Sequence, residues 1–181
     1  MGVADGYAMR RLKAPARLSR SPKKAMMEIG WAAFGEVARQ LAARIALKFR
    51  PDTVVGIAKG GVFAGGALAA ALSADFRPVR IEKRRRDAAR PTPDAAEQLP
   101  DLKGLRVLVV DDVSASGSTL AKARALCKKA GAREVRSAVL VKRPDGGRPD
   151  WYALETDQLV LFGWDYQLDG GGAVDPGEVG V

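Results

Sequence analysis

The sequence predicts an α/β domain built on a mostly parallel sheet flanked by helices. Short β-branched runs alternate with stretches of helical periodicity along most of the 181 residues. Strands that alternate with helices favour a parallel sheet. Hydrophobic residues make up 47% of the chain, so a chain of this length can bury a core without metals or disulfides.

The expected elements follow one another in order along the chain. A helix is expected over 28–49, because Phe34, Val37 and Leu41 recur at spacings of three and four before Pro51 ends the pattern. The other expected helices cover 62–74 and 119–130, the second stopped by Gly131. Strands are expected over 53–58, 78–82, 105–111, 135–141 and 159–162.

Three segments lie outside this regular pattern. We expect an N-terminal arm over 1–27, a loop over 83–103 within a domain of residues 28–169, and a glycine-rich tail over 170–181. The net charge of +9 is concentrated in the arm and the loop. A long charged loop inside a compact domain is often a functional lid, and Arg84, Arg85 and Arg86 would then close over a ligand. The alternative is a solvated loop.

The composition excludes several classes of protein. The chain has no histidine, so a Ser-His-Asp triad and a histidine metal site are ruled out, and any metal needs oxygen ligands such as those magnesium prefers. Cys127 is the single cysteine, which favours a reducing compartment. Neither a signal peptide nor an apolar run of about 18 residues is present, so we expect a cytoplasmic protein without membrane contact.

The segment 107–120, VLVVDDVSASGSTL, carries the clearest chemical signal. An apolar strand leads into Asp111 and Asp112, and small and hydroxyl residues then precede a helix. Free backbone N–H groups at a helix start bind phosphate, and adjacent carboxylates suit sugar hydroxyls or magnesium. Each half alone is also a common way to cap a helix. Together they predict a site for a phosphorylated sugar.

At these residues the chain resembles the type I phosphoribosyltransferases, a fold whose parallel sheet carries a small hood. The resemblance covers roughly residues 28–167, is closest to the purine branch (xanthine–guanine and hypoxanthine–guanine enzymes), and implies Mg²⁺ as cofactor. It assigns the ribose hydroxyls and the metal to Asp111 and Asp112. The 5′-phosphate of 5-phosphoribosyl-1-pyrophosphate (PRPP) then falls to Ser114, Ala115, Ser116, Gly117, Ser118 and Thr119.

Two further segments match the same family in order. GIAKGG, residues 56–61, resembles the pyrophosphate loop, in which Lys59, Gly60 and Gly61 meet the leaving group and the Ala58–Lys59 bond is expected to be cis. A plain glycine turn is the alternative. Residues 138–166 resemble the base pocket, where Lys142 would reach a purine 6-oxo group and Leu159, Trp164 and Asp165 would line the base. Trp164 also suits a core position.

Two positions depart from the 6-oxopurine pattern. Ala115 stands where those enzymes place an aspartate near the base, although adenine-type relatives tolerate alanine there. Leu159, preceded by Gln158, stands where an aromatic ring usually stacks on the base. Both departures affect the identity of the base more than the phosphoribosyl chemistry.

The resemblance implies transfer of the phosphoribosyl group to a nucleobase, with Lys59, Asp111 and Asp112 as catalytic residues and pyrophosphate as product. We also expect a homo-oligomer. One alternative is a regulatory protein of the same fold that binds PRPP or a nucleotide and touches nucleic acid through its basic arm. Others are an enzyme acting on a pyrimidine or another acceptor, and a purely structural protein.

Overall fold

The computed structural model describes residues 25–81, 99 and 101–165. Most of the predicted arm, most of the predicted loop with Arg84–Arg86, and the predicted tail lie outside these residues. The expectations for these three segments therefore stay predictions. Within the described residues no helix is long and apolar enough to cross a membrane.

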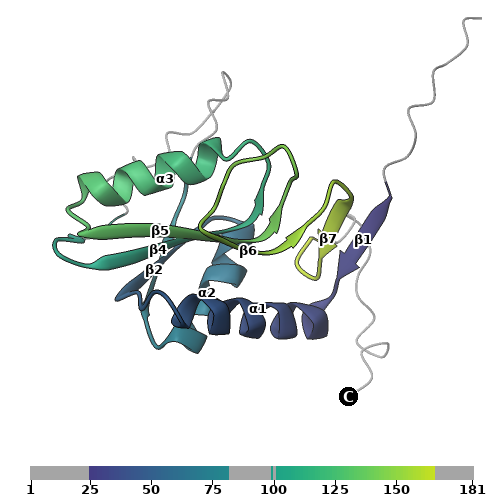
Figure 1. The fold of residues 1–181 in the computed structure, drawn as a ribbon, viewed down its shortest axis with the longest axis horizontal. Helices are drawn as coiled ribbons and strands as arrows, with labels where there is room; N and C mark the ends of the chain where they lie inside the picture. Colours follow the sequence, from purple (N-terminus) through teal and green to yellow (C-terminus); the bar gives the residue numbers. More distant parts are fainter. Residues whose placement is uncertain (1–24, 82–98, 100, 166–181) are drawn as a thin grey trace, which may run out of the picture.

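A five-stranded, fully parallel sheet forms the centre of the molecule (Figure 1). Its strand order is β3-β2-β4-β5-β6. The central strands β2, β4 and β5 are the most apolar, as expected for strands covered on both faces. The bounds are β2 (Thr53–Ile57), β3 (Asp75–Val79), β4 (Arg106–Ser114), β5 (Glu134–Lys142) and β6 (Trp151–Glu155).

Helices cover both faces of this sheet and divide the core in two. The helices α1 (Trp31–Ala46) and α2 (Gly60–Leu72) lie on one face, and α3 (Ser118–Lys129) lies on the other (Figure 1). Leu41, Ile45 and Leu68 pack with Leu108 and Leu140 in the first core cluster. On the α3 face the core is completed by a second cluster that includes Val107, Val109, Leu120, Cys127 and Val139.

A separate two-stranded sheet forms the hood at one end of the molecule (Figure 1). Its strands β1 (Met26–Ile29) and β7 (Leu159–Phe162) pair in parallel, with Ile29 opposite Phe162. The hood joins the first core cluster through these two buried residues and Val160. The predicted α/β fold, with a parallel sheet, flanking helices and a small hood, is thus confirmed.

Several predicted boundaries are wrong. The first helix begins at Trp31, because Met26–Ile29 is a strand that takes up the last two residues of the predicted arm. The strand expected over 78–82 lies at Asp75–Val79, in register with β2 from Thr53 onward. Strand β6 was not predicted.

Two leucines near the end of the predicted loop 83–103 are packed into the domain. Leu99 and Leu102 are buried in the second core cluster. The backbone N–H of Leu102 donates to the carbonyl of Ala130, at the end of α3. Hydrophobic burial of two leucines therefore anchors this segment just before β4.

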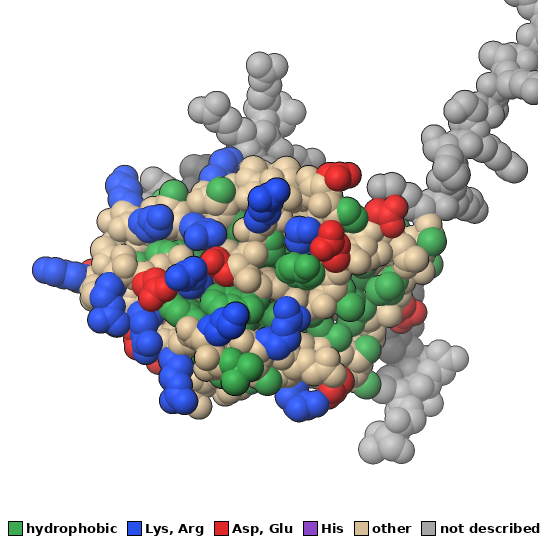
Figure 2. Space-filling model, in the orientation of Figure 1, with side chains coloured by type: hydrophobic (Ala, Val, Ile, Leu, Met, Phe, Trp, Pro, Cys, Tyr) green, Lys and Arg blue, Asp and Glu red, His purple; other side chains and the backbone are tan. Residues whose placement is uncertain are grey.

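Lys and Arg side chains are spread unevenly over the surface. In Figure 2 they gather over the part of the molecule away from the hood. The most exposed large hydrophobic side chains include two at the hood, Met26 and Leu159, and two near it, Trp31 and Phe63. On this face the basic side chains thus lie mainly away from the hood, and the exposed large hydrophobic side chains lie at or near it except Leu47, which follows the last turn of α1.

Candidate functional site

The connections that follow strands β2, β4, β5 and β6 begin at one edge of the central sheet. Strands β2, β4, β5 and β6 run in the same direction, so their carboxyl ends lie together. The connections after them begin at Ala58, Ala115, Arg143 and Thr156. Ligands of open parallel sheets bind at this edge. The predicted site residues from Lys59 to Lys142 fall on these strand ends, in the loops after them or at the starts of α2 and α3.

The turn Lys59–Gly61 lies directly against the predicted acid pair. A side-chain carbon at Gly60 would overlap the carboxylate of Asp112. A side-chain carbon at Gly61 would stand 2.7 Å from the carbonyl oxygen of Val110 and 3.0 Å from the Cα of Asp111. Only glycine permits this approach. The Ala58–Lys59 bond is cis, as predicted, and the Lys59 side chain is exposed.

The acid pair is held by its own backbone. The Asp111 carboxylate accepts a hydrogen bond from the N–H of Asp112 at 3.0 Å, and the Asp112 carboxylate accepts one from the N–H of Val113 at 2.7 Å. Strand β4 continues through both residues to Ser114, beyond the predicted end at Asp111. Both carboxylates are half-buried on a strand, so their position is fixed by the sheet and not by a loop.

The predicted phosphate loop is a tight turn between β4 and α3. Gly117 has a φ of 77°, which glycine adopts without strain, and helix α3 starts at the next residue. The Ser116 and Ser118 hydroxyls hydrogen-bond each other at 3.0 Å. Ala115, Ser116 and Ser118 are exposed, but the Ser114 side chain is buried and its hydroxyl has no partner among the described residues.

A surface hollow of about 500 Å³ opens beside this loop. Its lining includes Ser116–Ser118 together with three basic side chains, Arg124, Lys128 and Arg148. The start of a helix carries partial positive charge on its free N–H groups. Lys128 lies in the last turn of α3 and Arg124 is paired with Asp150, so the feature that favours an anion beside the loop is the helix start itself.

Lys142, predicted to contact the base, is already paired. Its ammonium lies 3.0 Å from the carboxylate of Glu155, its cross-strand neighbour on β6. It also lies 5.3 Å from the centre of the Tyr152 ring. The Lys142 side chain is 14% exposed and that of Glu155 is 39% exposed, so the lysine end of this ion pair is shielded from water and the carboxylate end is open to it. A contact between Lys142 and a base stays a prediction.

The remaining predicted base residues belong to the hood. The Trp164 ring stacks on Phe162 and on Phe63, with ring centres 4.6 Å and 4.8 Å apart, and meets Trp31 and Phe34 edge-on. This supports the core interpretation of Trp164. The Asp165 carboxylate accepts the N–H of Phe162 within a turn, and Leu159 is 50% exposed. Base contacts by these residues are not tested by this geometry.

Cys127 is not a candidate nucleophile. It lies fully buried on α3, and burial raises the pKa of its thiol to about 11. A thiol with such a pKa is not the nucleophilic thiolate at neutral pH. Among residues 25–81, 99 and 101–165 no group of three or more acidic or cysteine side chains could hold a metal by itself.

The structure adds residues that the sequence did not single out. The turn Arg143–Gly147 packs against the phosphate loop, and Glu155 pairs with Lys142. The Pro-Asp-Gly-Gly run at 144–147 is a turn signal that was visible in the sequence. Its place beside residues 114–117 required the pairing of β4 with β5.

Comparison with protein families agrees with this geometry. The phosphoribosyl transferase domain model matches residues 30–170. An adenine phosphoribosyltransferase of Brucella suis is 40% identical in an alignment of 115 positions that covers 58% of this chain and 64% of that protein. The same enzyme of Brucella melitensis is 39% identical over an equal span. The chain therefore covers less than two thirds of the length of these curated relatives.

Two solved structures share the fold. A purine phosphoribosyltransferase from Pyrococcus horikoshii superposes with a TM-score of 0.68 at 26% identity, covering 80% of this chain and 97% of that one. The xanthine–guanine–hypoxanthine phosphoribosyltransferase of Helicobacter pylori gives a TM-score of 0.65 at 16% identity, covering 78% and 93%. At this lower identity the likeness concerns the fold alone.

Proposed function

Because the chain belongs to the phosphoribosyl transferase domain family, we propose that it transfers the 5-phosphoribosyl group of PRPP to a purine and releases pyrophosphate. The observation that carries this proposal is the meeting of two segments far apart in sequence. The glycine turn at 59–61 touches the acid pair Asp111–Asp112. A pyrophosphate loop and a ribose site need this proximity, because the pyrophosphate on C1 and the hydroxyls on C2 and C3 belong to the same ribose ring.

Each part of the sugar diphosphate has a group suited to it. The backbone N–H groups of residues 115–119, at the start of α3, suit the 5′-phosphate. Asp111 and Asp112 suit the two ribose hydroxyls as acceptors. The N–H groups of Gly60 and Gly61 and the ammonium of Lys59 suit the departing pyrophosphate. The protein then works by positioning and by stabilising charge in the transition state.

The acid pair also fits a magnesium ion in part. Magnesium is usually bound by one or two carboxylates, with substrate phosphates and water completing its shell. Asp111 and Asp112 supply two carboxylates, and the described residues hold no third acidic group beside them. The ion would thus be held jointly by the protein and PRPP. When bound, it offsets negative charge on the pyrophosphate group.

Among purines, three observations favour adenine over 6-oxopurines. The Lys142 ammonium, expected to donate to a 6-oxo group, is engaged by Glu155 at 3.0 Å. Ala115 stands in the phosphate loop where 6-oxopurine enzymes carry an aspartate. The curated relatives from Brucella are adenine phosphoribosyltransferases. Adenine has an amino group at that position, so a lysine ammonium, which only donates, gains nothing from reaching it.

Base competition with the Lys142→Met variant tests the choice of base. Wild-type protein is expected to form nucleotide from adenine and PRPP, with hypoxanthine and guanine at least about tenfold poorer in kcat/KM, the discrimination that one unmatched polar group provides. Lys142→Met should change kcat/KM for adenine by less than about threefold, because the lysine does not touch this base. Preferred use of hypoxanthine, lost in Lys142→Met, would overturn the choice of adenine while keeping the transferase.

Asp112→Asn tests the ribose role. The variant keeps the size of the side chain but removes its charge and half of its acceptor capacity. We expect PRPP binding, measured by calorimetry with Mg²⁺ present, to weaken by at least about tenfold, the size of one charge-assisted hydrogen bond. The surface variant Asp75→Asn should bind as wild type. Unchanged PRPP binding in Asp112→Asn would contradict the proposed role.

A further inference from the structure

The connection between β5 and β6, residues 143–150, lies against the predicted phosphate loop. The backbone N–H of Arg143 donates to the carbonyl of Ser114 at 3.0 Å, and the N–H of Gly147 donates to the carbonyl of Ala115 at 3.1 Å. The N–H of Gly146 closes the turn by donating to the carbonyl of Arg143 at 2.9 Å. This is the turn expected from a Pro-Asp-Gly sequence.

Two glycines meet where the turn and the loop touch. A side-chain carbon at Gly117 would stand 2.6 Å from the Cα of Gly147, and one at Gly147 would overlap the Cα of Gly117 and stand 3.0 Å from its nitrogen. The obstruction on each side is backbone, which cannot rotate away. The nitrogen of Gly117 belongs to the segment expected to hold the 5′-phosphate. The turn therefore sets the position of that segment.

The Arg143 side chain reaches the opposite way, to the segment leading into the hood. Its guanidinium donates to the carbonyl of Thr156 at 3.0 Å and to the carbonyl of Gln158. Gln158 directly precedes Leu159, the first residue of β7. Arg143 thus links the phosphate loop, through its backbone, with the entry to the hood, through its side chain.

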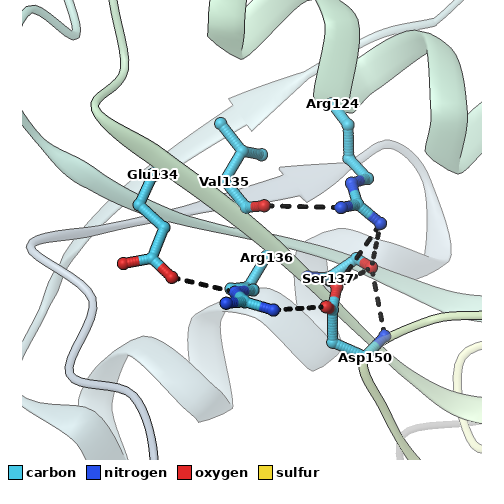
Figure 3. Close-up of polar contacts among 6 residues, drawn as sticks. All are labelled: Arg124, Glu134, Val135, Arg136, Ser137 and Asp150. Carbon is cyan, nitrogen blue, oxygen red and sulfur yellow. Dashed lines mark hydrogen bonds and ion pairs between the residues drawn. The ribbon is translucent and has the colours of Figure 1, made fainter.

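The far end of the connection is also anchored. The Asp150 carboxylate accepts hydrogen bonds from the backbone N–H and the hydroxyl of Ser137, both at 2.8 Å (Figure 3). Arg124 and Arg136 complete its shell, at 3.4 Å and 3.2 Å (Figure 3). Ser137 is fully buried on β5. Because the connection is anchored at both ends, it can hold the segments that it contacts at a fixed distance from each other.

From these contacts we propose that residues 143–147 act as a positioning element that sets the phosphate loop relative to the segment leading into the hood, where the base is expected. The inference rests on the proposed transferase function. Gly147 positions the PRPP side through its contact with Gly117. Arg143 positions the base side through the carbonyls of Thr156 and Gln158. Neither residue needs to touch a substrate.

Two variants should separate these roles. Gly147→Ala pushes on Gly117 and should raise the KM for PRPP by roughly tenfold or more, with a smaller change in the KM for adenine. Arg143→Met frees the 156–158 segment and should raise the KM for adenine more than the KM for PRPP. Arg143→Lys keeps one donor group in place of the guanidinium fork, so it should lie between wild type and Arg143→Met.

Gly35→Ala is the matched control, since a side-chain carbon at Gly35 meets nothing within 4 Å. It should keep both KM values. The Tm of each variant is measured by thermal unfolding, and all assays are run below it. A change in KM is then not caused by unfolding. Direct calorimetry of PRPP binding gives a readout independent of turnover, and Gly147→Ala should bind PRPP roughly tenfold more weakly than Gly35→Ala.

Each outcome bears on one of the two proposals. Wild-type protein that binds no PRPP would remove the proposed function and this inference with it. Wild-type binding with unchanged KM values in folded Gly147→Ala and Arg143→Met would overturn the positioning role alone. Should Gly147→Ala fail to fold, Arg143→Met decides. A selective rise in the KM for adenine supports the inference, and KM values equal to those of wild type overturn it.

Discussion

The central sheet and the hood are both built from parallel strands but differ in their protection from water. Val54 and Val55 of β2 and residues 107–110 of β4 have no exposed surface. In the hood, Met26 is 64% exposed and Leu159 is 50% exposed. The sheet is covered on both faces by helices, whereas the two hood strands have only each other as strand partners. The hood is therefore less protected from water than the central sheet.

This difference matches the separate roles that we propose for the central sheet and the hood. The acid pair and the phosphate loop lie at the end of β4, the central strand of the protected sheet. The residues predicted to line the base lie mostly on β7 and the turn after it. A rigid sugar-phosphate site combined with a less protected base side allows the base to vary while the phosphoribosyl chemistry stays fixed.

The largest expected effect compares the cores of the two regions. Leu108→Ala removes a fully buried side chain from β4 and should lower the free energy of unfolding by about 2–5 kcal/mol. Val160→Ala in the hood removes a smaller buried side chain and should cost about 1–2 kcal/mol. Urea unfolding monitored by circular dichroism measures both. An equal loss in the two variants would contradict the comparison.

A second prediction concerns the edge of the sheet where the site lies. Gly60→Ala must displace the Asp112 carboxylate, because the added methyl group overlaps it. A displacement of about 1 Å can reduce kcat/KM by roughly 100-fold, and we expect a loss of this order with PRPP as the varied substrate. Gly66→Ala, six residues further along α2 in open space, should retain activity. Full activity of Gly60→Ala would break the proposed contact between the two loops.

The smallest expected effect concerns the charge that fixes β6 to the sheet. Burial alone raises the pKa of Asp150, but hydrogen bonds from Ser137 and Arg136 outweigh it and the net pKa is lowered. A lowered pKa in the folded state stabilises the protein above the ordinary aspartate pKa of about 4, and this stabilisation is lost as the pH falls through the folded value. Asp150→Asn keeps an acceptor oxygen for the Ser137 donors but loses the charge, at a cost of about 1 kcal/mol near neutral pH.

Unfolding measured between pH 7 and pH 2 checks this prediction. The difference between wild type and Asp150→Asn should shrink as the pH falls, because the wild-type carboxylate becomes protonated. Asp75→Asn, an exposed aspartate 3.9 Å from Arg77, should change stability little at any pH. Parallel curves for wild type and Asp150→Asn would show that this carboxylate does not carry the expected stabilisation.

The protected region was also the more predictable one. Apolar runs in β2, β4 and β5 predict buried strands, and the helical patterns between them predict a parallel sheet. The acid pair and the small-residue turn lie within one short stretch of sequence, so the sequence alone predicts a sugar-phosphate site there. The cis bond at Ala58–Lys59 was expected from the resemblance and is found.

The hood and its neighbours depend on contacts distant in sequence. Strand β1 exists because Met26 pairs with Leu159, 133 positions away, and its four residues carry no strand signal of their own. The pairing of Lys142 with Glu155 depends on β6, which was not predicted. The identity of the base was thus harder to predict than the sugar site, since it depends on these long-range pairings.

A crystal structure with PRPP and Mg²⁺ tests the central claim most directly. We predict that the 5′-phosphate lies within hydrogen-bond distance of the backbone N–H groups of residues 115–119, with the ribose hydroxyls on Asp111 and Asp112. A sugar diphosphate bound elsewhere, or a loop whose N–H groups point away from the phosphate, would contradict the account.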